Sequence, residues 1–240
     1  MAENYAGILA EKALGHDDQN RAATTDISNP ARDGGKYADE SGERMKALVW
    51  MGKNDVRVRK WPQHHQNLPP PLPRYPTEKP VLTLGTVEIP KPRIIDSHDV
   101  IVRVTGSTVC GSDVHLLHGV IMQTEKGDIL GHEFCGVVES IGPAVTKLSP
   151  GDRVVNSFCI SCGECRYCKE KLPTACEKTN ASRLHAKLYG GRLSGIFGYS
   201  HFVGGYAGGQ AEYVRVPLAD NNLLKLPDSV PDEKGRQVPR

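Results

Sequence analysis

The chain has 240 residues, a formal net charge of +2 and 38% hydrophobic residues. So balanced a charge gives no global attraction to nucleic acid or to an anionic membrane, and we expect neither as a partner. No apolar run approaches the roughly 20 residues that span a bilayer, and the first residues lack the basic and apolar regions of a secretory signal. We therefore expect a cytoplasmic protein with one large domain or two small ones.

Residues 1–45 are polar and acidic, with five Lys and Arg against nine Asp and Glu. The segment "GHDDQNRAATTDISNPARDGGK" shows no apolar periodicity and offers no face to bury. We interpret 1–45 as a disordered acidic tail.

Strand patterns follow at "MKALVW" (45–50), "DVRVRK" (55–60) and "DVIVRVT" (99–105). Between the last two, nine of the 17 prolines fall between Pro62 and Pro92. Proline lacks the N–H that a sheet ladder requires, so residues 61–86 are not a central strand. An exposed insertion is the main interpretation, and a Pro-rich ligand of SH3 or WW domains is the alternative.

Short strands separated by Gly and Pro turns are predicted at "FCGVVESIG", "DRVVNSF" and "QAEYVRVP". Many short strands at close spacing predict a mainly β, barrel-like domain with short helices. The best helix candidate is "GSDVHLLHG", with Ser112 or Asp113 as its N-cap and Gly119 ending it.

Four of the seven cysteines lie close together in "SCGECRYCKEKLPTAC", with the spacing C-x2-C-x2-C-x7-C. Two-residue gaps let a turn direct successive thiolates at one point, and a short loop brings in the fourth. Four thiolates form a closed tetrahedral zinc site that stabilises a lobe too small for its own core. Two disulfides and an iron–sulfur cluster are the alternatives. The predicted structural zinc ligands are Cys162, Cys165, Cys168 and Cys176.

A second, open metal site is suggested by "TVCGSDVH" and "GHEFCG". A catalytic zinc has three protein ligands and one exchangeable position, and Cys110 and His132 are suitable ligand types. Asp113 can orient His132 by accepting its second ring N–H. Ser112 and His115 can pass a proton from an alcohol to water. We assign Cys135 and Cys159 to the core, with Cys159 as a possible spare ligand for the knuckle.

These motifs together resemble those of the zinc-dependent medium-chain alcohol dehydrogenases. "GHEFCGVVESIGPAV" matches the zinc signature GHE-x2-G-x5-G-x2 of that family, and the knuckle has the family's spacing. "YGGRLSGIFGYSHFVGGYAGGQAEYVRVP" is similar to the glutathione-independent formaldehyde dehydrogenase branch.

The resemblance implies a GroES-like β-barrel catalytic domain over residues 46–232, with a structural zinc lobe at 159–178. It implies that Cys110 and His132 bind the catalytic zinc and that Glu133 serves as an alternative ligand. In the same way, Ser112 and His115 match the proton relay and Asp113 the partner of the histidine. Full-length members oxidise a small alcohol, or formaldehyde hydrate, with NAD. The resemblance leaves open whether the protein forms a homo-oligomer.

Three departures from the family stand out. No two glycines are separated by a single residue, so the dinucleotide fingerprint G-x-G-x-x-G does not occur. No third ligand of the catalytic zinc is recognised in "SVPDEKGRQVPR", and residues 61–86 have no counterpart. We expect 233–240 to be a truncated end, the Rossmann domain to be absent and this chain to be inactive alone. The alternative is a non-catalytic, zinc-stabilised binding module.

Overall fold

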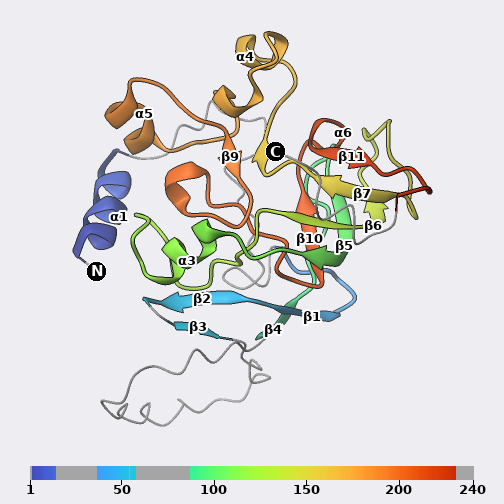
Figure 1. Ribbon diagram of the computed structural model, residues 1–240, viewed down its shortest axis with the longest axis horizontal. Coiled ribbons are helices and arrows are strands. Elements are labelled where there is room, and N and C mark those ends of the chain that lie inside the picture. Colours follow the sequence, from blue (N-terminus) through green and yellow to red (C-terminus); the bar gives the residue numbers. More distant parts are fainter. Residues whose placement is uncertain (1, 15–36, 54, 58–86, 231–240) are drawn as a thin grey trace.

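The computed structural model describes residues 2–14, 37–53, 55–57 and 87–230 (Figure 1). Strands dominate these ranges and the helices between them are short, which confirms the prediction of a mainly β fold. Three predicted stretches lie outside the described residues: the Pro-rich segment 61–86, the end 233–240 and residues 15–36 of the predicted tail.

The largest sheet has five strands in the order β10-β5-β6-β7-β11, and every neighbouring pair is antiparallel. Its strands are β5 (Val100–Ser107), β6 (Phe134–Ile141), β7 (Arg153–Asn156), β10 (Tyr213–Val216) and β11 (Leu223–Lys225). Valines dominate them because β-branched side chains suit a half-buried pleated surface. Val100, Val102 and Val154 are fully buried and form the main core together with Phe197.

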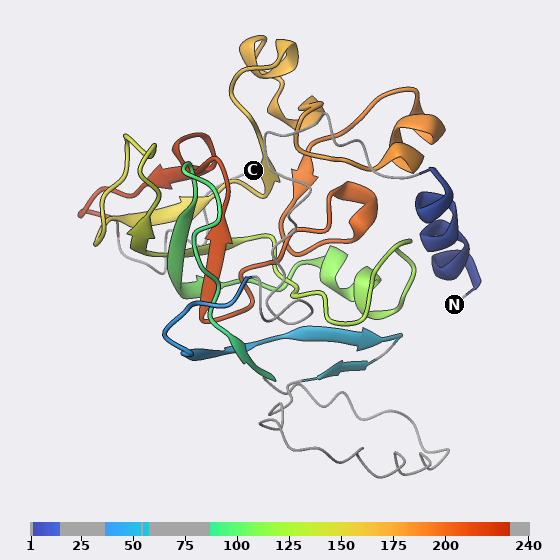
Figure 2. The same cartoon turned by 180° about the vertical axis from the view of Figure 1, so that it is seen from behind.

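Three two-stranded pairs complete the β structure. They are formed by β1 (Arg44–Ala47) with β4 (Val87–Pro90), β2 (Val49–Gly52) with β3 (Asp55–Arg57), and β8 (Cys159–Ile160) with β9 (Gly195–Ile196). In β1, Met45 and Ala47 are buried and Arg44 and Lys46 are exposed, as expected for a strand with one covered face. The strands β1 and β2 run along one side of the molecule (Figure 2), and isolated bridges from Ala47 to Ala211 and from Val49 to Ile129 join them to the rest of the structure.

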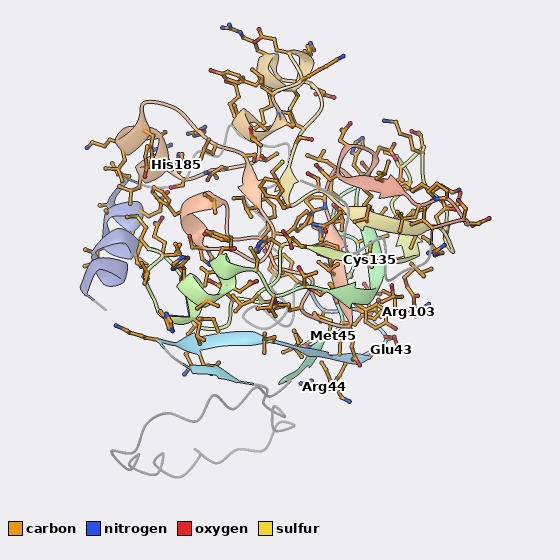
Figure 3. All side chains as sticks on the ribbon, viewed as in Figure 1. Glu43, Arg44, Met45, Arg103, Cys135 and His185 are labelled. Atoms are coloured by element: carbon orange, nitrogen blue, oxygen red, sulfur yellow. The ribbon has the colours of Figure 1, made fainter. Side chains whose placement is uncertain are left out.

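Charged side chains gather where β1 meets the large sheet. Glu43, Arg44 and Arg103 lie there together in Figure 3, and Lys91 forms ion pairs with Glu43 at 3.0 Å and with Glu139 at 3.3 Å. These polar contacts cover the outer surface of a junction whose inner side is apolar.

The helices between the strands are α3 (Gly111–Leu117), α4 (Arg166–Lys169), α5 (Arg183–Tyr189) and α6 (Ala219–Asn222), with 3-10 turns η2 (Pro173–Ala175) and η3 (His201–Val203). The predicted N-cap of α3 was wrong: the cap residue is Cys110, not Ser112 or Asp113. Asp113 instead occupies the third helical position, where its Oδ2 accepts the backbone N–H of Cys110 at 2.8 Å. Gly119 follows the helix with φ +65°, consistent with the predicted stop.

The structure differs from the predicted tail at its start, because Ala2–Leu14 forms the helix α1. This stretch is rich in strong helix formers such as Ala, Leu and Glu. α1 packs against α5, and Glu11 is only 6% exposed. Its carboxylate accepts the hydroxyl of Ser182 at 2.8 Å and the backbone N–H groups of Arg183 at 3.0 Å and Leu184 at 3.2 Å. The helix was missed because its composition alone was not read as a helix and because its partner, Ser182, lies 171 positions away in the chain.

Candidate metal centres

The lobe that carries α4 (Figure 1) also carries η2. Four cysteine side chains converge in this lobe. Their sulfur atoms all lie within 4.8 Å of one another, and Cys162–Cys168 and Cys165–Cys176 are separated by 3.9 and 4.0 Å. A disulfide requires an S–S distance of about 2.05 Å, and all four are free thiols. Sulfurs bound tetrahedrally to zinc at about 2.3 Å would lie about 3.8 Å apart. The group therefore has the dimensions of a closed four-thiolate metal site.

The electrostatics of this group also favour a cation. Burial raises the pKa of Cys162, and it raises the pKa of Cys168 to about 12. Burial opposes ionisation of Cys165 too, but N–H groups of Cys168 and Glu177 lower its pKa to about 7. Four crowded thiols cannot all ionise in such a setting unless a positive charge lies among them. A divalent metal supplies that charge, so the residues fit zinc.

A buried asparagine attaches this lobe to the sheet. Asn222 of α6 accepts the backbone N–H of Ser161 at 2.8 Å and donates to the Ser161 carbonyl at 3.1 Å. It also donates to the carbonyls of Pro217 and Leu218 at 3.1 Å. Since Ser161 directly precedes Cys162, Asn222 fixes the point at which the chain enters the cysteine group.

The second group is formed by Cys110, His132 and Glu133, each of which has a ligand atom within 4.8 Å of the others. The register of the sheet explains how they meet. Ser107, the last residue of β5, pairs with Phe134, the first residue of β6. The chain beyond Ser107 and the chain before Phe134 therefore leave the sheet at the same end. This places Cys110 beside the His132–Glu133 pair.

His132 lies between two side chains from α3. Its Nδ1 is 3.8 Å from Oδ1 of Asp113, and its Nε2 is 3.1 Å from the hydroxyl oxygen of Ser112. Both Nδ1 and Oδ1 are buried and have no hydrogen-bond partner among the described residues. Burial raises the pKa of Asp113. A small closing movement would let Nδ1 donate to Asp113, leaving Nε2 as the ligand atom on the Cys110 side.

Cys110 and Glu133 provide the anionic ligand atoms that a cation requires. A hydrogen bond from the Ser112 side chain, with others from the Ser112 backbone and from His132, lowers the pKa of Cys110 to about 7. The Glu133 carboxylate accepts the hydroxyl of Thr108 at 2.6 Å, and its carbonyl accepts the Thr108 N–H at 3.1 Å. One thiolate, one imidazole and one carboxylate form a donor set that suits zinc.

Glycines allow the segment 208–210 to pack directly against the backbone before His132. A Cβ on Gly131 would lie 2.5 Å from the backbone N of Gln210, and one on Gly208 would lie 2.3 Å from the carbonyl O of Leu130. Neither position tolerates a side chain at such distances. The backbone N–H of Gly209 donates to the Gly131 carbonyl at 2.8 Å. His132 is thus held on a rigid backbone platform.

The predicted site residues fall into three sets. Cys110, His132 and Glu133 converge, and Ser112 and Asp113 contact His132. His115 is exposed on α3, and within the described part of the chain no hydrogen bond joins it to Ser112 or to His132. Cys135 (Figure 3) and Cys159 are buried, and Cys159 lies outside the four-sulfur group.

Sequence reasoning missed three residues beside this group. The Tyr199 ring meets the His132 ring edge-on at 6.0 Å, and burial raises the pKa of Tyr199. Thr108 holds Glu133, and Gln210 donates to the Thr108 carbonyl at 3.0 Å. Thr108 is two residues from Cys110, a signal that could have been used. Tyr199 and Gln210 come from a distant loop and carry no such signal.

Comparison with known proteins identifies the family of this chain. Residues 96–228 match the family model of the alcohol dehydrogenase GroES-like domain, which is more than half of the chain. The chain belongs to this family. The predicted GroES-like fold and the predicted relationship to zinc-type dehydrogenases are therefore confirmed.

Individual relatives show how much of the family's length this chain represents. It is 39% identical over 233 residues to a zinc-type alcohol dehydrogenase-like protein of Schizosaccharomyces pombe, covering 97% of this chain and 46% of the relative. It is 39% identical over 188 residues to a glutathione-independent formaldehyde dehydrogenase of Pseudomonas aeruginosa, covering 78% and 38%. An alcohol dehydrogenase from Thermus sp. ATN1 superposes with a TM-score of 0.60 at 33% identity, over 79% of this chain and 42% of that one.

The chain thus spans less than half the length of these relatives. In the part of the chain that the structure describes, no helix has the length and apolar character required to cross a membrane.

Proposed function

We propose that this chain is the zinc-binding, substrate-side domain of an NAD-dependent alcohol or formaldehyde dehydrogenase. The observation that carries the proposal is the convergence of Cys110, His132 and Glu133 in one group, separate from the four-cysteine lobe. A closed four-thiolate site stabilises structure but has no position for a substrate. A group with three ligand atoms of mixed type has such a position.

Each residue of the open group has a distinct role in this proposal. Cys110 and His132 hold the zinc, and Glu133 provides a carboxylate on the same side of the site. Bound zinc acts as a Lewis acid that polarises the oxygen of an alcohol or aldehyde. Asp113 would accept the Nδ1 proton of His132 once the 3.8 Å gap between the two atoms closes, and this would fix the tautomer and orientation of the ring. Ser112, whose hydroxyl oxygen lies 3.1 Å from His132 Nε2, would take the alcohol proton while giving its own hydroxyl proton to solvent. His115 is exposed on α3 and is the proposed second relay group, although among the described residues no hydrogen bond joins it to Ser112.

Hydride transfer also requires a nicotinamide held about 3–3.5 Å from the reacting carbon. The glycine fingerprint that would hold the dinucleotide does not occur in these 240 residues. We therefore expect the isolated chain, loaded with zinc, to form no NADH from NAD and formaldehyde or a primary alcohol. Absorbance of NADH checks this, and turnover that disappears in Cys110→Ala would contradict it.

The proposed function is tested by cobalt substitution, because Co²⁺ bound at each group has its own absorption. A site with one thiolate gives weaker charge-transfer bands than a four-thiolate site. We expect a small primary alcohol or formaldehyde to shift the bands of the Cys110 group and to leave those of the four-cysteine lobe unchanged. A Cys110→Ser variant is the matched control and should lose only the responsive bands. If no alcohol or aldehyde changes either set, the protein is a zinc-stabilised binding module.

A further inference from the structure

A side chain on β7 lies directly against the segment that carries His132 and Glu133. Asn156 is the last residue of β7 and is partly buried. Its Oδ1 accepts the backbone N–H of Phe134 at 2.7 Å, and its Nδ2 donates to the backbone carbonyl of His132 at 2.9 Å. These two backbone groups lie on either side of Glu133. One side-chain amide therefore spans the residue from which a candidate ligand projects.

The sheet register explains why a side chain occupies this position. The ladder between β6 and β7 ends with the pair Cys135–Val155, so the next pair along would be Phe134 with Asn156. At that point the Phe134 N–H bonds the Asn156 side chain. The amide thus extends the ladder by one step and reaches past it to His132. The chain can leave the sheet at His132 without losing its hydrogen bonds.

The support for Asn156 itself is rigid. Its backbone pairs with Leu223 on β11, and the next residue, Ser157, donates its N–H to the Asn222 carbonyl at 2.9 Å. The second proton of Nδ2 goes to the Ser157 carbonyl at 2.9 Å. Because hydrogen bonds hold both the backbone and the side-chain amide of Asn156, the amide can hold the groups that it contacts in fixed positions.

Only an amide on a short stem satisfies these contacts together. Asparagine offers one acceptor and two donors in a single plane, and here the acceptor meets an N–H while both donors meet carbonyls. Aspartate would keep the Phe134 contact but lose both donors. Leucine would fill a similar volume and lose all three bonds.

We propose that Asn156 is a positioning residue for the metal centre: by holding the peptide groups on both sides of Glu133, it presents His132 and Glu133 to Cys110. This inference rests on the proposed function, in which these three residues bind zinc. On the opposite side, Ser107 and Thr108 hold the Glu133 carbonyl, at 3.1 Å each. The segment 132–134 is therefore fixed between β5 and β7, and Asn156 makes the hydrogen bonds from β7.

The test is a Co²⁺ titration of the full chain, followed at the bands of each group. We expect Asn156→Ala to weaken Co²⁺ binding at the Cys110 group by about 10–100-fold, the usual effect of removing an outer-shell partner. The four-thiolate bands should keep their intensity, which also shows that the variant is folded. Asn156→Leu should lose affinity to a similar extent, because volume without hydrogen bonds does not hold the segment.

Asn222→Ala is the matched control, since Asn222 holds Ser161 beside Cys162 as Asn156 holds His132 and Phe134. It should weaken the four-thiolate bands and leave the Cys110 group unchanged. If Asn156→Ala does not fold, Asn156→Asp, which keeps one of the three bonds, is titrated instead with the same expected direction. Affinity equal to that of the original chain in Asn156→Ala, Asn156→Leu or the Asn156→Asp substitute overturns the inference alone. Absence of Co²⁺ binding at Cys110 in the original chain overturns both the inference and the proposed function.

Discussion

The two metal-binding groups of this protein are assembled in opposite ways. The four cysteines lie within fifteen consecutive residues, from Cys162 to Cys176. In the part of the chain that the structure describes, the hydrophobic side chains packed against the cysteine cluster, apart from the cysteines themselves, are Tyr167 and Leu218. Cys110, His132 and Glu133 come from two segments that the sheet register brings together, and residues of β5, β7 and α3 hold them.

This difference predicts which of the two groups needs its metal in order to fold. A lobe with almost no apolar core depends on metal–sulfur bonds for its shape. The open group stands on a scaffold that is complete without metal, because its supports are backbone hydrogen bonds and glycine packing. Metal should therefore be coupled strongly to folding at the first group and weakly at the second.

The largest expected effect is at the cysteine lobe. We expect Cys165→Ser to lose one zinc per chain and to lower the free energy of unfolding by at least about 3 kcal/mol, a fall in Tm of about 6–12 °C. Elemental analysis and calorimetry measure the two quantities. Cys159→Ser is the control, because Cys159 is buried but lies outside the four-sulfur group. Unchanged zinc content in Cys165→Ser would show that the four cysteines do not hold a zinc on which the lobe depends.

A smaller loss is expected at the platform behind His132. Gly131 has φ +101°, and a Cβ there would lie 2.5 Å from the Gln210 backbone N. We expect Gly131→Ala to cost about 1–3 kcal/mol, the range for overpacked interiors, and to weaken metal binding at the Cys110 group. Gly151 has a similar φ of +93° but nothing within 4 Å. Gly151→Ala should therefore cost less, and equal costs in urea unfolding would show that backbone strain, not packing, dominates.

The smallest effect on stability is expected at Cys110 itself. Cys110→Ser should lose the metal of the open group, so zinc falls from two per chain to one, while Tm changes by less than about 2 °C. The scaffold explains this, because the hydrogen bonds that Thr108 and Asn156 make to the His132–Phe134 segment do not involve the thiol. Calorimetry of zinc-loaded protein is the measurement. A fall in Tm as large as that of Cys165→Ser would mean that both groups depend on metal to fold.

The same contrast explains what could be predicted from the sequence. The cysteine spacing encodes its group locally, so Cys162, Cys165, Cys168 and Cys176 could be named from it. Alternating valines indicated the strand β5, and short apolar runs between Gly and Pro turns indicated β6, β7 and β10. The signature "GHE" indicated His132, but the sequence could not show that Ser107 would face Phe134 and bring Cys110 alongside.

Two of the features that were missed, the role of Asn156 and the helix α1, have partners far away in the chain. Asn156 acts on residues 22 and 24 positions away. The helix α1 depends on a contact between Glu11 and Ser182, 171 positions apart. Such contacts satisfy polar groups only in the folded chain, and no local pattern records them. The cap of α3 was also misplaced, because a cysteine is an unusual residue at that position.

The contact between Glu11 and the start of α5 also sets an order in time during synthesis. At about 5–20 residues per second, the 171 positions between Glu11 and Ser182 take about 10–30 s to translate. A helix of 13 residues is only marginally stable alone in water. On the nascent chain, α1 therefore lacks its packing partner until α5 has left the ribosome. The order of synthesis therefore separates α1 from the segment that it packs against.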